Sequence, residues 1–148
     1  MKSKKLFIIF LSALILIFLD QLTKFIIKNS LKINESIPII KNIFHITYTI
    51  NTGSFFGILK GWQLPIIFFS IIVIGFIFYY LDKIKEKEKL LQIFTGFILG
   101  ATIGNLIDRL IFRHVIDFLD FRIWPVFNIA DSFITVSVIF LIIYFWKK

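Results

Sequence analysis

The side chains best suited to chemistry in this chain are two aspartates in its C-terminal third, Asp117 and Asp131. Two carboxyl groups held close together share one proton, because neighbouring like charges do not both ionise easily. One group can then accept a proton from water while the other donates a proton to a scissile carbonyl. The pair therefore predicts acid–base hydrolysis. A structural alternative exists for Asp131, since Pro125 stops any preceding helix, Asn128 would be a good N-cap and Asp131 would fall in the first helical turn.

The sequence contains few residues that could form other kinds of catalytic site. The 148 residues include no cysteine and only two histidines, His45 and His114. No His-Glu-x-x-His sequence is present, so the zinc-protease helix is excluded, and the sequence predicts neither a metal ion nor a cofactor. A Ser–Lys pair remains open, formed by Lys24 with either Ser54 or Ser132.

Further polar side chains lie within or at the ends of long apolar segments, where charged groups are costly and are functional candidates by default. These residues are Asp20, Lys24, Asn105, Asp108 and Arg109. Asp20 and Lys24 are four residues apart and would share one helix face, which favours a structural ion pair. The other three also share a face, and neutralisation of Asp108 by Arg109 is the favoured interpretation there.

Four apolar segments must position these residues: 6–27, 64–81, 90–107 and 129–146. Each is long enough to cross a hydrocarbon core of about 30 Å as a helix. A hydrophobic content of 58%, a charged content of 18% and a mean hydropathy of +0.90 exclude disorder and disfavour a soluble helical bundle. We therefore predict an all-α membrane protein with four transmembrane helices, in a single integral-membrane domain covering residues 1–148. The first segment lacks a small-residue cleavage site and is expected to remain as a helix.

Basic residues predict how these helices are oriented. Nine lysines lie at the two termini and in the loop between the second and third segments: Lys2, Lys4, Lys5, Lys83, Lys85, Lys87, Lys89, Lys147 and Lys148. Positive residues concentrate on the cytoplasmic side, so both termini and this loop are expected there. The net charge of +8 thus needs no nucleic acid as a partner. All the ionisable candidates then fall in one layer near the extracytoplasmic face.

The first extracytoplasmic connection carries a second pattern. Residues 44–50 alternate Phe44, Ile46, Tyr48 and Ile50 with polar residues, which predicts a half-buried strand. A small extracytoplasmic β-sheet region on the membrane is therefore expected.

Five motifs together resemble the lipoprotein signal peptidases, also called signal peptidase II. They are DQLTK at 20–24, NTG at 51–53, GNLIDR at 104–109, VIDF at 115–118 and FNIADS at 127–132. Their order, the chain length and the four spans all match that family. The chain departs from the family pattern at Gly100-Ala101, where a second glycine is usual, and at Ser54-Phe55 after the NTG motif.

The resemblance implies a bacterial cell-membrane aspartyl endopeptidase. It would remove signal peptides from prolipoproteins, cutting just before a cysteine that carries diacylglycerol, with membrane lipids as its surroundings. The catalytic pair would be Asp117 and Asp131. Substrate-binding or supporting roles would fall on Asp20, Lys24, Asn51, Gly53, Asn105, Asp108, Arg109 and Asn128.

Two other functions stay open at this point. A small proton- or ion-translocating protein could use membrane carboxylates as a relay, although a relay needs groups at several depths. A non-catalytic lipid-binding or assembly subunit is the other alternative, and it would lack peptidase activity when purified.

Overall fold

Helices make up most of the molecule, which we describe from a computed structural model covering residues 2–53 and 62–148. They are α1 (Lys2–Ser30), α2 (Gln63–Tyr80), α3 (Lys89–Phe112) and α4 (Ile129–Trp146), and a short 3₁₀ helix, η2 (Leu81–Lys83), follows α2. All four long helices have the length and the apolar composition needed to cross a membrane. The four predicted spans are therefore confirmed, with the largest difference at the end of α3.

The helix α3 continues for more than a turn beyond its predicted end at residue 107. Its last polar residues, Asn105, Asp108 and Arg109, are buried rather than marking the exit from the apolar layer. The helix ends at Arg113, whose φ of 64° is left-handed and whose backbone N–H donates to the carbonyl of Arg109 at 3.2 Å. Hydropathy alone predicted the end of the helix too early, because these polar side chains have partners inside the protein.

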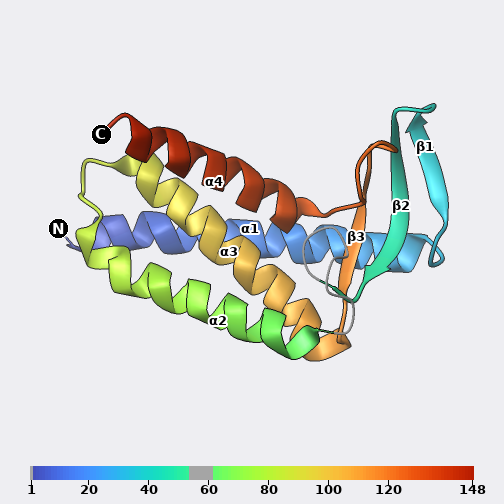
Figure 1. Ribbon diagram of the computed structural model, residues 1–148, viewed down its shortest axis with the longest axis horizontal. Helices are drawn as coiled ribbons and strands as arrows, with labels where there is room; N and C mark the ends of the chain where they lie inside the picture. The colour runs from blue at the N-terminus through green and yellow to red at the C-terminus, as the bar shows by residue number, and fades with distance from the viewer. Residues whose placement is uncertain (1, 54–61) are drawn as a thin grey trace.

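The helix α3 lies at the centre of the bundle, and the other three helices pack against it (Figure 1). Its contact with α1 is the closest, because Gly96, Gly100 and Gly104 present no side chain to that helix. A Cβ atom added to Gly100 would lie 2.5 Å from the carbonyl oxygen of Ala13. The departure at Ala101 is accommodated on another side of α3, where Ala101 is fully buried in a cluster with Leu16 and Ala130.

A three-stranded antiparallel sheet lies beside the C-terminal part of α1, and both chain termini lie at the opposite end of the bundle (Figure 1). Its strands are β1 (Ser36–Ile40), β2 (Phe44–Asn51) and β3 (Val115–Asp120), in the order β1-β2-β3. The strand predicted at residues 44–50 is confirmed as β2. The sequence reasoning missed β1 and β3; β3 has buried residues on both faces, so its sequence shows no alternation.

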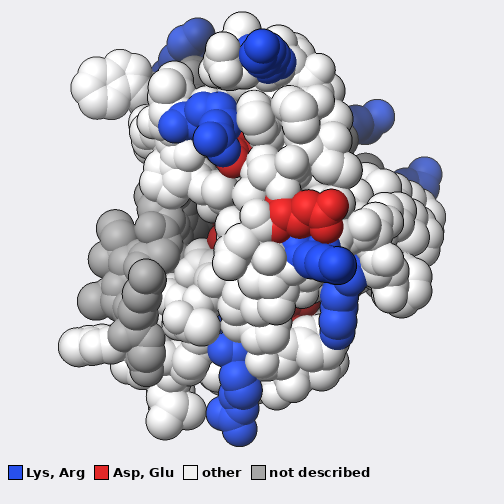
Figure 2. Space-filling view, turned by 90° about the vertical axis from the view of Figure 1, so that its right-hand side faces the viewer, with Lys and Arg blue, Asp and Glu red and all other residues white. Residues whose placement is uncertain are grey.

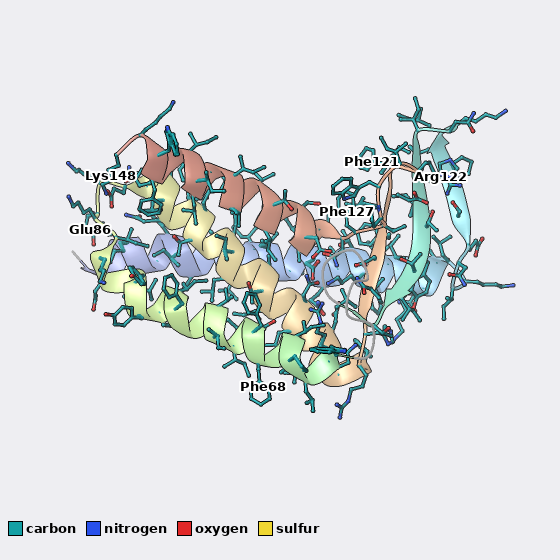
Figure 3. The ribbon with its side chains drawn as sticks, in the orientation of Figure 1. Phe68, Glu86, Phe121, Arg122, Phe127 and Lys148 are labelled. Carbon is teal, nitrogen blue, oxygen red and sulfur yellow. The ribbon has the colours of Figure 1, made fainter. Side chains whose placement is uncertain are left out.

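Much of the helical surface is apolar and faces outward. Figure 3 shows Phe68 directed away from the bundle, with an exposed fraction of 64%. Figure 2 shows the sheet end of the molecule, where the visible basic side chains are scattered among uncharged residues rather than gathered into one patch. The outward apolar surface fits a lipid environment.

Candidate active site

The two predicted catalytic aspartates lie on neighbouring elements at the sheet end of the bundle. Asp117 is in the middle of β3, and Asp131 is in the first turn of α4. Asn128 connects them: its Nδ2 donates to Asp117 Oδ1 at 2.7 Å, and its Oδ1 accepts from the backbone N–H of Asp131 at 2.9 Å. Both carboxyl groups are buried. One amide side chain thus joins the carboxyl group of Asp117 to the backbone of Asp131, a residue 14 positions further along the chain.

A second amide holds the Asp117 carboxyl group, and an amide from another element holds that of Asp131. Asn51, at the end of β2, donates its Nδ2 to Asp117 Oδ2 at 2.8 Å. Asn105, from α3, donates its Nδ2 to Asp131 Oδ1 at 2.9 Å. Asn105 Oδ1 in turn accepts from Asn128 Nδ2 at 3.2 Å. The three amides therefore link β2, β3, α3 and α4 around the two carboxyl groups, and their donors leave little freedom for either group to rotate.

Asp131 takes part in the start of its helix and in the polar cluster. Asn128 has the extended backbone of an N-cap, and its side chain accepts from the N–H of Asp131, as the structural interpretation expected. The carboxyl group of Asp131 instead accepts a hydrogen bond from Asn105 on α3. The side chain of Asn128 thus caps the helix, and the Asp131 carboxyl group binds the cluster through Asn105 while it also lies near the backbone of Asn128.

A charged cluster supports these amides from behind. Lys24 Nζ lies 2.7 Å from Asp20 Oδ2 and 2.8 Å from Asp108 Oδ2, and it donates to Asn105 Oδ1 at 2.9 Å. Asp20 Oδ1 accepts from the backbone N–H of Ala130 at 3.0 Å, at the start of α4. The expected pair of Asp20 and Lys24 is present. Asp108 pairs with Lys24, so its neutralisation comes from α1 rather than from Arg109.

Arg109 occupies a different position from the one expected. Its guanidinium donates to the carbonyl oxygen of Gly53 at 3.2 Å and to that of Asn105 at 3.1 Å. Gly53 itself donates its N–H to Asn51 Oδ1 at 2.9 Å, a local turn that holds the amide pointing at Asp117. Arg109 therefore fastens the end of β2 to α3 and brings its positive charge within electrostatic reach of the carboxyl pair.

Gln21 is a site residue that the sequence reasoning missed. Its Nε2 donates to Asp108 Oδ1 at 3.0 Å and to the carbonyl oxygen of Gly104 at 3.2 Å. A Cβ atom on Gly104 would lie 2.6 Å from Asp20 Oδ2, so only glycine leaves room for this carboxylate. The signal available in the sequence was the position of Gln21 between Asp20 and Lys24 in an otherwise apolar helix.

Burial and charge repulsion change the acidity of Asp117. Removal from water, then the neighbouring charge of Asp131, raise the pKa of Asp117 to about 7, despite hydrogen bonds from Asn51 and Asn128 that favour the ionised form. Asp120 behaves in the opposite way. Although burial acts to raise it, hydrogen bonds from Thr47 and Arg122 hold the pKa of Asp120 below its usual value. Within this strand, Asp117 can thus carry a proton near neutral pH and Asp120 cannot.

Alternative sites are less well formed. Among the described residues, no group of three or more His, Asp or Glu side chains is placed to hold a metal ion. His45 contacts Ser36 in the sheet, 3.1 Å from its hydroxyl, and His114 lies beside Phe112. Of the Ser–Lys candidates, Ser132 donates its hydroxyl to the backbone carbonyl of Asn128, at 2.9 Å, and Ser54 lies outside the described residues, as does Phe55.

A groove leads along the surface to Asp131. Its volume is about 460 Å³, within the range of about 300–1,000 Å³ typical of small-molecule sites. The walls come from α4 and from the segment between β3 and α4, including Phe121, Trp124, Phe127 and Val136. Figure 3 shows Phe121 and Phe127 on that segment, beside the start of α4. An apolar chain lying in this groove would reach Asp131.

Comparisons with known proteins agree on one family. A family model described as "Signal peptidase (SPase) II" matches residues 12–147. The chain is 44% identical to a lipoprotein signal peptidase of Halothermothrix orenii, over 95% of this chain and 96% of the relative. It is 41% identical to a lipoprotein signal peptidase of Moorella thermoacetica, over 88% of this chain and 87% of the relative. It also superposes on a solved bacterial membrane enzyme with a TM-score of 0.87 and 34% identity, covering 93% of this chain and 86% of that one. The match over nearly the whole chain, together with the four membrane-length helices, shows that this chain belongs to the signal peptidase II family.

Proposed function

We propose that this chain is an aspartyl endopeptidase that removes signal peptides from prolipoproteins, with Asp117 and Asp131 as its catalytic pair. The observation that carries the proposal is that Asn128 joins the buried carboxyl group of Asp117 to the backbone of Asp131, whose own buried carboxyl group lines a groove. The family and the names of its relatives support the substrate class.

The reaction follows from one proton shared by the two carboxyl groups. The ionised group takes a proton from a water molecule while the water oxygen attacks the carbonyl carbon of the scissile peptide bond. The protonated group donates its proton to the carbonyl oxygen. The tetrahedral intermediate then collapses: the C–N bond breaks, the amine leaves with the proton that was taken from water, and one hydroxyl of the intermediate returns its proton to the carboxylate that had donated one. Because the pKa of Asp117 is about 7, the pair can hold this proton at neutral pH.

The remaining polar residues act as positioning residues in this scheme. Asn51, Asn105 and Asn128 set the directions of the carboxyl oxygens, because each donates to one of them. Lys24 offsets the buried charges of Asp20 and Asp108 and orients Asn105 through its oxygen. A buried charge left without a partner would be far more costly than the assembled cluster.

The substrate is proposed to carry diacylglycerol on the cysteine that follows the cleavage site. Trp124 and Ile123, beside the groove, are exposed by 54% and 94%, which offers apolar contact at the mouth of the site. Acyl chains lying in the membrane next to α4 would bring that cysteine to the carboxyl pair without leaving the lipid. Cleavage would therefore depend on prior lipidation.

We place the chain in the bacterial cell membrane with both termini in the cytoplasm and the active site near the extracytoplasmic face. The lysines at the two termini and in the 83–89 loop support this orientation, since they all belong to the end of the bundle away from the sheet. Reporter fusions at Lys148 and near Lys41 should report opposite sides. Fusions that report the same side would refute the four-span arrangement.

A relay for protons or ions is not favoured by the positions of the charges. Within the described helices, buried acidic groups gather at the sheet end, as Asp20, Asp108 and Asp131. Lys5, at the other end, is bound to the backbone carbonyls of Asp82 and Ile84. No described acidic side chain is buried between these two layers, so protons would have no steps across the bundle.

The deciding experiment is cleavage of a diacylglyceryl-modified prolipoprotein by the purified chain. Wild type should cut it, Asp117→Asn should not, and the unlipidated prolipoprotein should be a poor substrate. Asp120→Asn is the matched control, because this carboxylate lies in the same strand but binds Thr47 and Arg122. Loss of activity in both variants would show that cleavage depends on the intact strand rather than on the Asp117 carboxyl group.

A further inference from the structure

A second groove lies at the end of the bundle away from the carboxyl cluster. Helices α2 and α4 both pack on α3, and the groove runs between them with α3 as its floor. Its volume is about 530 Å³. The walls are almost entirely apolar, and they include Val73, Ile77, Leu91, Ile98, Leu141 and Phe145. The shape and lining suit a flexible hydrocarbon chain rather than a polar ligand.

Charged side chains are confined to one end of this groove. Lys83, from η2, and Lys148, at the C-terminal end, both line it. Lys83 Nζ lies over the rings of Tyr80 and Tyr79, 4.2 Å and 4.8 Å from their centres. These aromatic contacts hold the ammonium group at the groove while leaving its N–H donors available to an anion.

Glu88 is the acidic residue at the same place, and its oxygens are already used. It accepts from the Tyr144 hydroxyl at 2.7 Å, from Lys148 Nζ at 3.1 Å and from the backbone N–H of Lys85 at 2.8 Å. Those bonds, the one from Tyr144 above all, lower the pKa of Glu88 to about 2. Glu88 therefore acts as a fixed anchor for Lys148, whose side chain remains 51% exposed.

We propose that this groove binds one anionic phospholipid, with an acyl chain between α2 and α4 and its phosphate between Lys83 and Lys148. The ligand must be apolar along its length and anionic at one end, because the groove is apolar along its length and basic at one end. Basic pockets between transmembrane helices on the cytoplasmic side are known to bind anionic head groups. The excess of lysines at this end of the chain favours an anionic over a zwitterionic head group. The inference concerns the opposite end from the carboxyl pair and does not depend on the mechanism.

The test measures lipid retention by the purified full-length chain with native mass spectrometry. Dioleoyl phosphatidylglycerol should bind at least about tenfold more tightly than dioleoyl phosphatidylcholine, a difference of about 1.4 kcal/mol. The double variant Lys83→Gln/Lys148→Gln should lose that preference. The matched control, Lys85→Gln/Lys87→Gln, removes the same amount of charge from the same end of the bundle but outside the groove. This control should keep the preference for phosphatidylglycerol.

A second pair of variants tests the position of the acyl chain. Val73→Trp fills the groove and should weaken binding of both lipids, whereas Ile72→Trp, on the preceding residue of α2 and 66% exposed, should not. Glycerol 3-phosphate should fail to displace the lipid. Cleavage of prolipoprotein should stay unchanged in every variant, which verifies folding.

Three results would overturn the proposal. Equal loss of phosphatidylglycerol binding in the two lysine double variants would mean general attraction to a basic surface. Unchanged binding in a folded Val73→Trp variant would mean that no chain occupies the groove. Displacement by glycerol 3-phosphate would mean an anion site without a lipid chain.

Discussion

Replacement of Asp117 by asparagine tests both its burial and its catalytic role. The variant keeps the size of the side chain and removes the proton that can be exchanged. We expect cleavage of the lipidated prolipoprotein to fall at least about 100-fold, because an amide cannot act as an acid or a base. We also expect the stability of the wild type, relative to the variant, to fall as pH rises.

The size of the stability effect follows from the pKa of Asp117. Removal from water and the charge of Asp131 raise this pKa from 3.8 to about 7. Each unit corresponds to about 1.4 kcal/mol, so the proton contributes up to about 4 kcal/mol. Because the pKa is raised, the contribution is fully present below pH 3.8 and is lost as pH rises through about 7. Removing Asp117 also relieves the repulsion on Asp131, which acts in the same direction.

A second, pH-independent cost comes from the hydrogen bonds. Both Asp117 oxygens accept from amides, those of Asn51 and Asn128. An asparagine at 117 has one oxygen, so its own NH₂ group must face one of these donors. Neither neighbour can rotate freely, because the Asn51 oxygen accepts from Gly53 and the Asn128 oxygen from Asp131. An unsatisfied buried donor costs about 1–3 kcal/mol at every pH.

The assay is unfolding of both proteins in detergent, followed by tryptophan fluorescence between pH 4 and 8. The variant should be less stable at pH 4, and its deficit should shrink by up to about 4 kcal/mol toward pH 8. Activity of the wild type should decline above about pH 7 as the pair loses its shared proton. A stability difference that stays flat across this range, or near-normal turnover by the variant, would refute the reasoning.

Four further predictions concern the surrounding residues. The Asp131→Asn variant should fold and bind substrate, but its cleavage rate should fall at least about 100-fold. The double variant with Asp117→Asn should be scarcely slower than either single variant. Near-normal turnover by Asp131→Asn would mean that Asp131 has a structural role only. The Lys24→Ala variant should lose activity, and its free energy of unfolding should fall by about 3–5 kcal/mol, because Asp20 and Asp108 lose the ammonium group that pairs with both. A stable but inactive variant would instead favour a Ser–Lys mechanism. Gly104→Ala should reduce activity by pushing on Asp20, 2.6 Å from the added methyl, whereas Gly75→Ala, with nothing within 4 Å, should not. Cleavage should survive strong chelation, and rescue of a chelated enzyme by zinc would contradict the aspartyl mechanism.

Hydropathy and residue type, which are local properties of the chain, determined the four spans and the charged candidate residues, whereas Asn51 and Gly53 came from the family resemblance. A run of apolar residues forms a membrane helix whatever it packs against, because its backbone hydrogen bonds close within the segment. A charged residue in such a run is conspicuous because a charge within the membrane is costly, as at Asp20 and Lys24. The alternation in β2 was equally local, since only one of its faces was expected to be buried.

Partnerships between these residues were decided by the tertiary structure. Which carboxylate Lys24 pairs with depends on how α1 and α3 are rotated about their axes, and the glycine stripe on α3 sets that contact. The link from Asp117 to Asp131 through Asn128 depends on the pairing of β3 with β2, opposite Thr49. The bonds of Lys24 to Asn105 and of Asn51 to Asp117 join elements far apart in the chain, so no short window of sequence contains them. The sequence alone therefore identified almost every residue of the cluster, while the contacts that make Asp117 and Asp131 one unit came from packing.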